Sequence, residues 1–248
     1  MTKLASFSPQ LRVAVIGASG GIGAALVQSL AEHERVAGVY AFSRTPCSVV
    51  SAKVIHGDLD VLDEESIERC ANLAASDAPL DIVIVATGVL WSGEALRPEK
   101  NMRELDAAKL SRVFAVNAFG PALVAKHFLP TLRKDSKTVF AALSARVGSI
   151  GDNRLGGWYA YRASKAALNM LLKTLSIEHA RLWRQSVVVG LHPGTVDTGL
   201  SGPYSTRTPP EKLFSPATSA SYLLDVIDAA TTTDSGSVIA WDGKRIEN

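Results

Sequence analysis

The amino-acid sequence predicts an α/β protein: a doubly wound parallel sheet of about seven strands, flanked by helices, in a single domain over residues 1–248. Short apolar runs alternate with segments of helical periodicity through the whole chain, which is typical of βαβ units. A cluster of glycines follows the first apolar run and opens the first helical segment. With 248 residues, 47% of them hydrophobic and 20% charged, the chain can bury a substantial core. No repeat, linker or change of composition divides it.

The elements follow from this alternation in order. The first expected strand covers residues 12–16, and the helix after the glycines extends to about His33. Residues 80–86 are rich in β-branched side chains without polar alternation, as in a strand that is covered on both faces. The other expected strands cover 36–42, 53–56, 138–143, 187–191 and 237–240. Four further helices are expected. One begins at about Asp63, and one spans residues 105–134 with a bend near Gly120. The third begins at about Tyr159, and the last spans residues 217–230.

The glycine cluster is the first candidate for a functional site. Strand, glycine turn and helix in this order are what a nucleotide-phosphate site requires, because the helix N-terminus favours negative charge. Gly17 would permit the tight turn, Gly21 would let the backbone approach a pyrophosphate, and Gly23 would let helix and strand pack closely. The spacing differs from that of the commoner dinucleotide fingerprint, so the cluster by itself is also compatible with a simple turn.

The end of the second expected strand indicates which dinucleotide the chain prefers. Sites specific for NAD usually place a carboxylate there to bind the ribose 2′-hydroxyl. Residues 40–45 contain no acid, and Arg44 follows Ser43. Because a guanidinium suits a 2′-phosphate, we expect NADP(H) to be preferred over NAD(H). The alternative is that Arg44 is a solvated loop residue.

Tyr161 and Lys165 are the strongest candidates for catalysis. They are four residues apart on an expected helix and therefore share one face. A tyrosine titrates near pH ~10, and a neighbouring ammonium lowers the pKa toward a value useful for proton transfer. The competing interpretation is an ordinary surface pair. Tyr159 is the rival tyrosine, but it is six residues from Lys165 and would point elsewhere.

Three further features bear on the site. Asn117 lies in an apolar stretch, where a buried amide needs partners; it would bond to a neighbouring strand or hold a catalytic water. Residues 199–216 form a long segment rich in Gly, Pro, Ser and Thr, which we expect to act as a substrate lid. The candidate aromatic residues for an apolar pocket are Trp91, Trp158, Tyr204 and Phe214.

Composition argues against several other functions. A net charge of +2 and the absence of basic runs give no support for a nucleic-acid partner. Two cysteines and five histidines show no metal-ligand spacing, so no metal is expected. The N-terminus has no signal-peptide pattern, and the uncharged stretch 13–31 contains four glycines, so we expect no membrane span and a cytoplasmic location.

Taken together, the sequence resembles the short-chain dehydrogenase/reductase family, and most closely its C-factor and sniffer-like carbonyl reductase branch. The resemblance covers essentially the whole chain and implies a Rossmann fold. Four ordered motifs carry it, and the candidate residues fall at or just beyond the carboxyl ends of expected strands. The motifs are Gly17-x3-Gly21-x-Gly23, Asn117 with Gly120, Tyr161-x3-Lys165, and Pro193-Gly194 with Thr198.

The resemblance implies roles for these residues. Tyr161 is the acid/base, Lys165 lowers its pKa and binds the nicotinamide ribose, and Asn117 holds a water of a proton relay. Asp58 approaches the adenine, and Val196 and Thr198 approach the nicotinamide. The implied cofactor positions are Gly17, Ser19, Gly20, Gly21, Ile22, Gly23, Ser43, Arg44, Asp58, Leu59, Thr87, Gly88, Tyr161, Lys165, Pro193, Gly194, Val196 and Thr198. The implied activity is hydride transfer between NADP(H) and a small carbonyl or alcohol substrate in a homodimer or homotetramer.

Two departures from the family pattern matter. Residues 85–88 read Val-Ala-Thr-Gly where the family has Asn-Asn-Ala-Gly, a mainly structural motif. Ala145 occupies the position of the catalytic serine, whose hydroxyl would stabilise charge on the substrate oxygen. Ser144 or Ser149 would have to substitute, and we favour Ser144. Because this hydroxyl is missing, we also consider a second function: a catalytically weak signalling or scaffold protein that binds a nucleotide. A nucleotide-sugar epimerase is less compatible, because the chain leaves no room for an added C-terminal substrate region.

Overall fold

The computed structural model describes residues 3–93, 96–202 and 209–247, and these are organised around one eight-stranded sheet with the order β10-β9-β6-β5-β4-β1-β2-β3. Seven strands run parallel, as predicted, and β10 adds an antiparallel edge beside β9. The strands are β1 Leu11–Ile16, β2 Val36–Ser43, β3 Val54–Asp58, β4 Ile82–Val85, β5 Thr138–Leu143, β6 Ser186–His192, β9 Val238–Ala240 and β10 Arg245–Ile246.

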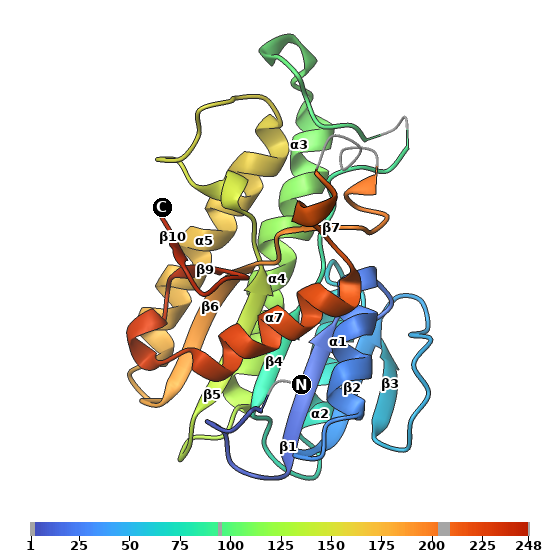
Figure 1. Ribbon diagram of the computed structural model, residues 1–248, viewed down its shortest axis with the longest axis vertical. Helices are drawn as coiled ribbons and strands as arrows, with labels where there is room; N and C mark the ends of the chain where they lie inside the picture. Colours follow the sequence, from blue (N-terminus) through green and yellow to red (C-terminus); the bar gives the residue numbers. More distant parts are fainter. Residues whose placement is uncertain (1–2, 94–95, 203–208, 248) are drawn as a thin grey trace.

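Helices cover both faces of this sheet (Figure 1). Helices α1 and α7 lie together on one face, and α2, α4 and α5 lie on the other. This double cover explains why every residue of β4 is buried and why its sequence is a continuous apolar run. The helices are α1 Gly21–Ala31, α2 Glu64–Ala74, α3 Ala107–Phe114, α4 Gly120–Phe128, α5 Tyr159–His179 and α7 Pro216–Ala229.

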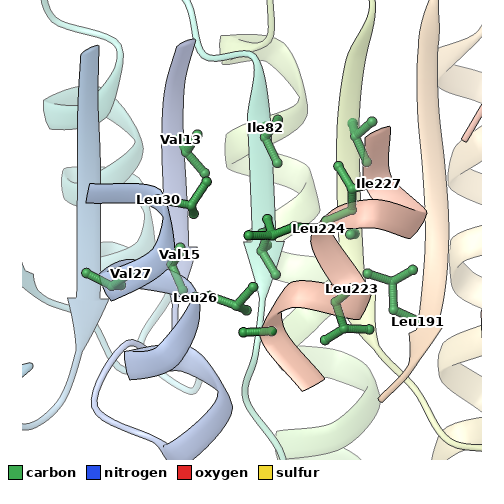
Figure 2. Close-up of a cluster of buried hydrophobic side chains, with 14 of the residues drawn as sticks. Val13, Val15, Leu26, Val27, Leu30, Ile82, Leu191, Leu223, Leu224 and Ile227 are labelled. Atoms are coloured by element: carbon green, nitrogen blue, oxygen red, sulfur yellow. The ribbon is translucent and has the colours of Figure 1, made fainter. Parts of the chain in front are cut away.

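The core under α1 and α7 shows how the helices are held. Figure 2 shows Leu26 and Leu30 of α1 directed at Val13 and Val15 of β1, with Leu223 of α7 on the same face of the sheet. These side chains are essentially inaccessible to solvent. Burial of each such side chain contributes about 1.5–3 kcal/mol, so the two helices are firmly fixed on the sheet.

The sequence predicted one continuous helix over residues 105–134, and this prediction is wrong. The structure has α3, then a π-helical segment at Ala115–Phe119, then α4 and a short 3₁₀ turn at Leu129–Thr131. The N–H of Gly120 bonds to the carbonyl of Ala115, five residues earlier. Pro121 has no N–H to donate to the carbonyl four residues before it, which favours this wider turn. The π segment contains Asn117.

The stretch Ala107–Thr131 has the length and composition of a membrane span, but half of its most apolar window is buried inside the protein. It packs against α2, α5 and the sheet. Length and composition alone do not distinguish a membrane span from a helix of a protein core.

The chain leaves β1 toward β2 and β3 but leaves β4 toward β5 and β6, so the direction of winding reverses between β1 and β4. Ligands of open α/β sheets bind beyond the carboxyl ends of the strands at this reversal. Nearby, the expected lid, residues 199–216, is more regular than the sequence suggested. Its residues Leu213–Phe214 (β8) pair with Thr195–Val196 (β7) as a two-stranded sheet, and Pro210–Lys212 form a 3₁₀ turn. Residues 203–208 lie outside the described part of the chain.

Candidate active site

The glycine turn between β1 and α1 is shaped by close backbone approach. Gly17 has φ +87° and donates its N–H to the carbonyl of Phe42 at 2.8 Å, which joins the turn to β2. A Cβ at Gly23 would lie 2.1 Å from the carbonyl oxygen of Gly17, so α1 can pack on the turn only because residue 23 has no side chain. A Cβ at Gly21 would lie 2.7 Å from the Thr198 side chain. The turn therefore lies in close contact with the segment after β7.

A cavity of about 380 Å³ begins at this turn. The Thr45 hydroxyl donates to the Ser19 hydroxyl at 2.9 Å, and the Ser43 hydroxyl donates to the Thr45 carbonyl at 2.6 Å. Arg44 is exposed at the same wall, so a guanidinium and hydroxyl groups face one end of the cavity. Asp58, expected near an adenine, is exposed and does not line the cavity, whereas the chain that follows it from Leu59 does.

A second cavity, of about 350 Å³, surrounds Tyr161. Its wall includes Ser144, Ala145, Arg146, Trp158 and His192. A third cavity, of about 260 Å³, shares Tyr161 and Ser144 with the second and Gly20, Thr87 and Gly88 with the first. Because their walls are shared, the three form one groove along the carboxyl edge of the sheet, from the glycine turn to Tyr161.

Tyr161 and Lys165 face the middle of this groove from α5. The ammonium nitrogen of Lys165 lies 5.8 Å from the centre of the Tyr161 ring, and it donates to the carbonyl of Leu143 at 2.7 Å. Burial lowers the pKa of Lys165 to about 8 and raises the pKa of Tyr161 to about 12. The expected lowering of the tyrosine pKa is therefore wrong for the protein chain by itself, because desolvation of the phenol outweighs the neighbouring amine.

Asn117 uses its amide to connect three elements. Its oxygen accepts from the N–H of Val89 at 2.7 Å, and its NH₂ donates to the carbonyl of Val89 at 2.8 Å. The NH₂ also lies 3.2 Å from the hydroxyl of Ser164 on α5. Asn117 is fully buried, and these contacts correspond to the structural alternative for its side chain. Its role in a water relay stays a prediction.

The two candidate serines lie in different places. Ser144 lines the cavity around Tyr161, and its hydroxyl donates to the Asn169 side chain at 2.6 Å. Ser149 lines a separate cavity with Tyr159, and its hydroxyl accepts from the N–H of Asp152 at 3.1 Å. The structure therefore brings Ser144, but not Ser149, to Tyr161. Ala145 lies at the same wall as Ser144.

The chain enters α5 through strained backbone. Gly156, Gly157 and Trp158 all have positive φ, and Trp158 does so at 52° despite its large side chain. The Trp158 ring meets the Tyr161 ring edge-on at 6.2 Å. Tyr159, in contrast, is 39% exposed and lines a different cavity from Tyr161.

The Pro193-Gly194 motif closes the far end of the groove. Gly194 has φ +79°, and a Cβ there would lie 2.6 Å from the Phe214 ring. Phe214 packs at 4.7 Å on Trp241, outside the Tyr161 cavity, and Trp91 also lies outside that cavity. Trp158 is thus the aromatic candidate that the cavity contains; Tyr204 is not among the described residues. Leu90, His192 and Leu200 also line the cavity, and the sequence patterns did not single them out.

The groove fits a dinucleotide. The glycines leave the space a pyrophosphate needs beside a helix N-terminus. The hydroxyl of Thr87 is buried without a partner among the described residues, at the point where the cavities meet. Within the same residues, no group of three His, Cys, Asp or Glu side chains is arranged to hold a metal ion.

Comparison with known proteins gives a consistent picture. The family model described as short chain dehydrogenase matches residues 12–208. The C-signal protein of Myxococcus xanthus is 35% identical over 170 residues, which cover 68% of this chain and 92% of the relative. The 1-hydroxy-2-glutathionyl-2-methyl-3-butene dehydrogenase of Rhodococcus sp. (strain AD45) is 32% identical over 93% of this chain and 96% of the relative. The NADPH-bound carbonyl reductase from chicken fatty liver has a TM-score of 0.83 at 25% identity, over 99% of this chain and 97% of the other.

Proposed function

Since this chain belongs to the short-chain dehydrogenase/reductase family of oxidoreductases, we propose that it transfers hydride between NADP(H) and a carbonyl or alcohol substrate, with Tyr161 as the acid/base. The observation that carries the proposal is the position of Tyr161 and Lys165 at the middle of one groove that begins at the glycine turn. The cofactor, when bound, supplies the hydride.

The residues of the chain supply position and the proton. With a pKa of about 12, the phenol of Tyr161 is protonated at neutral pH and can give its proton to an oxygen that becomes an alkoxide. Lys165 is held against the Leu143 carbonyl, so its ammonium group is fixed beside the phenol and favours the tyrosinate that remains. This protonation state suits carbonyl reduction.

The preference for NADP(H) is part of the proposal. Arg44 and the hydroxyl groups of Ser19, Ser43 and Thr45 face the cavity next to the glycine turn. A charged fork complements a 2′-phosphate, and the Ser19 hydroxyl, which accepts from Thr45, keeps its own hydrogen for such a group. The carbonyl reductase to which this chain is similar was determined with NADPH bound, which supports the same assignment.

We also propose that the protein is a homodimer or homotetramer. Met170 and Ile177 on α5 are 67% and 55% exposed, and Phe119 before α4 is 54% exposed. Large apolar side chains are costly to leave in water, so helices α4 and α5 are suited to a self-interface. Analytical ultracentrifugation of the purified protein tests this.

The enzymatic proposal is tested with purified protein, NADPH and a panel of aldehydes, ketones and quinones. We expect at least one substrate to be reduced, Tyr161→Phe to abolish turnover, and Tyr159→Phe to retain it. Binding of NADPH should survive both substitutions. The matched pair separates a specific role of Tyr161 from a general effect of losing a phenol.

A second candidate is a nucleotide-binding signalling or scaffold protein with little turnover. Ala145, which removes the expected serine hydroxyl, favours it, and so does the similarity to a protein named C-signal. Tight binding of NADPH with no oxidation by any substrate of the panel would favour this candidate over the enzyme.

A further inference from the structure

His192 lies at the carboxyl end of β6 and lines the cavity that contains Tyr161. Its backbone is fixed on both sides. The preceding residue, Leu191, pairs with Leu143 of β5 and accepts the N–H of Ser144 at 2.8 Å. The carbonyl of His192 accepts the N–H of Trp241 at 2.9 Å. The sheet therefore holds the imidazole next to the strand end that carries Ser144 and Ala145.

Among the described residues, no side-chain hydrogen bond accounts for the imidazole at this position. Its Nδ1 atom is buried and has no hydrogen-bond partner in the described part of the chain. Buried polar atoms are rarely left unpaired, and an acceptor nitrogen is left so at lower cost than an N–H. Hydrogen bonds within the described structure therefore do not account for a polar ring at this position.

The ring is neutral at physiological pH. Burial, with the nearby Arg146 guanidinium, lowers the pKa of His192 to about 4, and the Asp242 carboxylate opposes this only weakly. A neutral imidazole has one N–H and one lone pair. An unpaired acceptor is tolerated better than an unpaired donor, so we assign the lone pair to the buried Nδ1 and the hydrogen to Nε2. The ring then offers a donor without a charge.

At the position of the expected serine, the cavity wall offers no free hydroxyl among the described residues. Ala145 has no hydroxyl, and the hydroxyl hydrogen of Ser144 is directed to Asn169. The Arg146 guanidinium also lines this cavity, but it is paired with the Asp152 carboxylate at 3.5 Å, so Tyr161 is the donor already assigned to the substrate oxygen. A second donor would fix the orientation of the carbonyl and stabilise the negative charge that forms as hydride arrives at its carbon.

We propose that His192 is this second donor: its imidazole N–H binds the carbonyl oxygen of the substrate beside the Tyr161 hydroxyl. The inference rests on the proposed function. The covalent changes are those of the reduction itself: the carbonyl carbon receives hydride from the dihydronicotinamide, and the oxygen receives the proton of Tyr161. His192 gains and loses no proton.

The test compares His192→Leu, which removes the donor, with His192→Gln, which keeps an N–H. The assay is steady-state reduction of the best carbonyl substrate, with NADPH binding measured in parallel. We expect His192→Leu to lower kcat by about 10²-fold, as for loss of one donor to a developing oxyanion, and to leave the NADPH Kd within about twofold. His192→Gln should retain most of the turnover.

A second variant distinguishes the donor from packing. Ala145→Ser, combined with His192→Leu, places a hydroxyl at the same wall from a different strand, and we expect it to recover a large part of the lost kcat. A simple packing defect at residue 192 would not be repaired from residue 145. Urea unfolding of each variant shows whether the fold is intact.

The outcomes separate the two proposals. If the wild type reduces a carbonyl and His192→Leu reduces it equally well, the role of His192 is refuted and the enzymatic function stands. The role is also refuted if His192→Leu loses turnover and neither His192→Gln nor the added Ala145→Ser substitution restores it. If the wild type binds NADPH but reduces nothing, the proposed function itself fails.

Discussion

The carboxylate of Glu99 accepts a hydrogen bond from the backbone N–H of Ala160 at 3.1 Å, although 61 residues separate them in the chain. Its backbone carbonyl also accepts the N–H of Trp158 at 2.5 Å. The residue before α5, Trp158, provides no side-chain cap of its own. Glu99 therefore caps the first turn of the helix that bears Tyr161, and it does so from the loop after β4.

Loss of this cap should affect both stability and activity. We expect Glu99→Ala to lower the free energy of unfolding by about 1–2 kcal/mol, since a helix cap and a buried N–H lose their partner. Because Ala160 adjoins Tyr161, kcat should fall as well. Urea unfolding and steady-state kinetics check the two effects. Glu68→Ala, at an exposed position on α2, is the matched control. If both variants behave alike, the long-range cap has no special importance.

The amide of Asn117 gives a second prediction. In Asn117→Ala the N–H and carbonyl of Val89 both lose their partners, which should cost about 2–4 kcal/mol of stability. Chemical unfolding measures it, with Asn72→Ala, at an exposed position on α2, as control. A variant with normal stability but strongly reduced kcat would show instead that the residue serves mainly the predicted water relay.

Lys165 makes the stability of the protein depend on pH in a defined window. Its pKa is about 8 in the folded protein, whereas a lysine of the unfolded chain has the ordinary value of 10.5. Between these values the unfolded chain holds a proton that the folded chain has released, so the wild type gains stability as the pH rises from 8 to 10.5. Below that window, the cost of a buried ammonium is fully present.

The measurement is the difference in unfolding free energy between the wild type and Lys165→Met at several pH values. We expect the difference to shift in favour of the wild type as the pH rises through the window. The raised pKa of Tyr161 acts in the opposite sense and only above pH 10, because the unfolded chain there loses a proton that the folded chain keeps. The comparison is therefore made between pH 8 and pH 10, where Tyr161 does not contribute. Lys212→Met, at an exposed position, is the control, and its unfolding free energy should change with pH as that of the wild type does. If the unfolding free energy of Lys165→Met also changes with pH as that of the wild type does, burial of the Lys165 ammonium does not affect stability as predicted.

The sequence predicted the parts of the site that depend on short-range spacing. Tyr161 and Lys165 share a helix face because they are four residues apart, and Gly17 and Gly23 shape one turn. It could not predict Glu99, because the bond to Ala160 forms only when the loop after β4 is placed against α5. The π segment at Asn117 was missed for a related reason, since an apolar run with helical spacing does not distinguish a turn of five residues from one of four.

The strand order brings His192 beside Ser144, and nothing in the local sequence around His192 marks that neighbour. The direction of the Tyr161 pKa was wrong because spacing gives the partner of a group but not its desolvation. In both cases the missing quantity is tertiary: which strand ends are adjacent, and how much water remains around a polar atom. Residues 203–208, which include Tyr204, are outside the described structure, so their part in the lid stays a prediction.

Arg44 should determine the choice of cofactor. It is exposed at the cavity wall with Ser43 and Thr45, where a 2′-phosphate would have its charge neutralised. In Arg44→Asp, we expect kcat/KM for NADPH to fall by about 10- to 100-fold, as for loss of a charge-assisted bond worth about 1.5–3 kcal/mol, and kcat/KM for NADH to change little or rise. Arg181→Asp makes the same charge change at an exposed position beyond the end of α5 and should leave the ratio unaltered. An unchanged NADPH preference in Arg44→Asp would show that Arg44 is a solvated loop residue and that the hydroxyl groups around Ser19 select the cofactor without it.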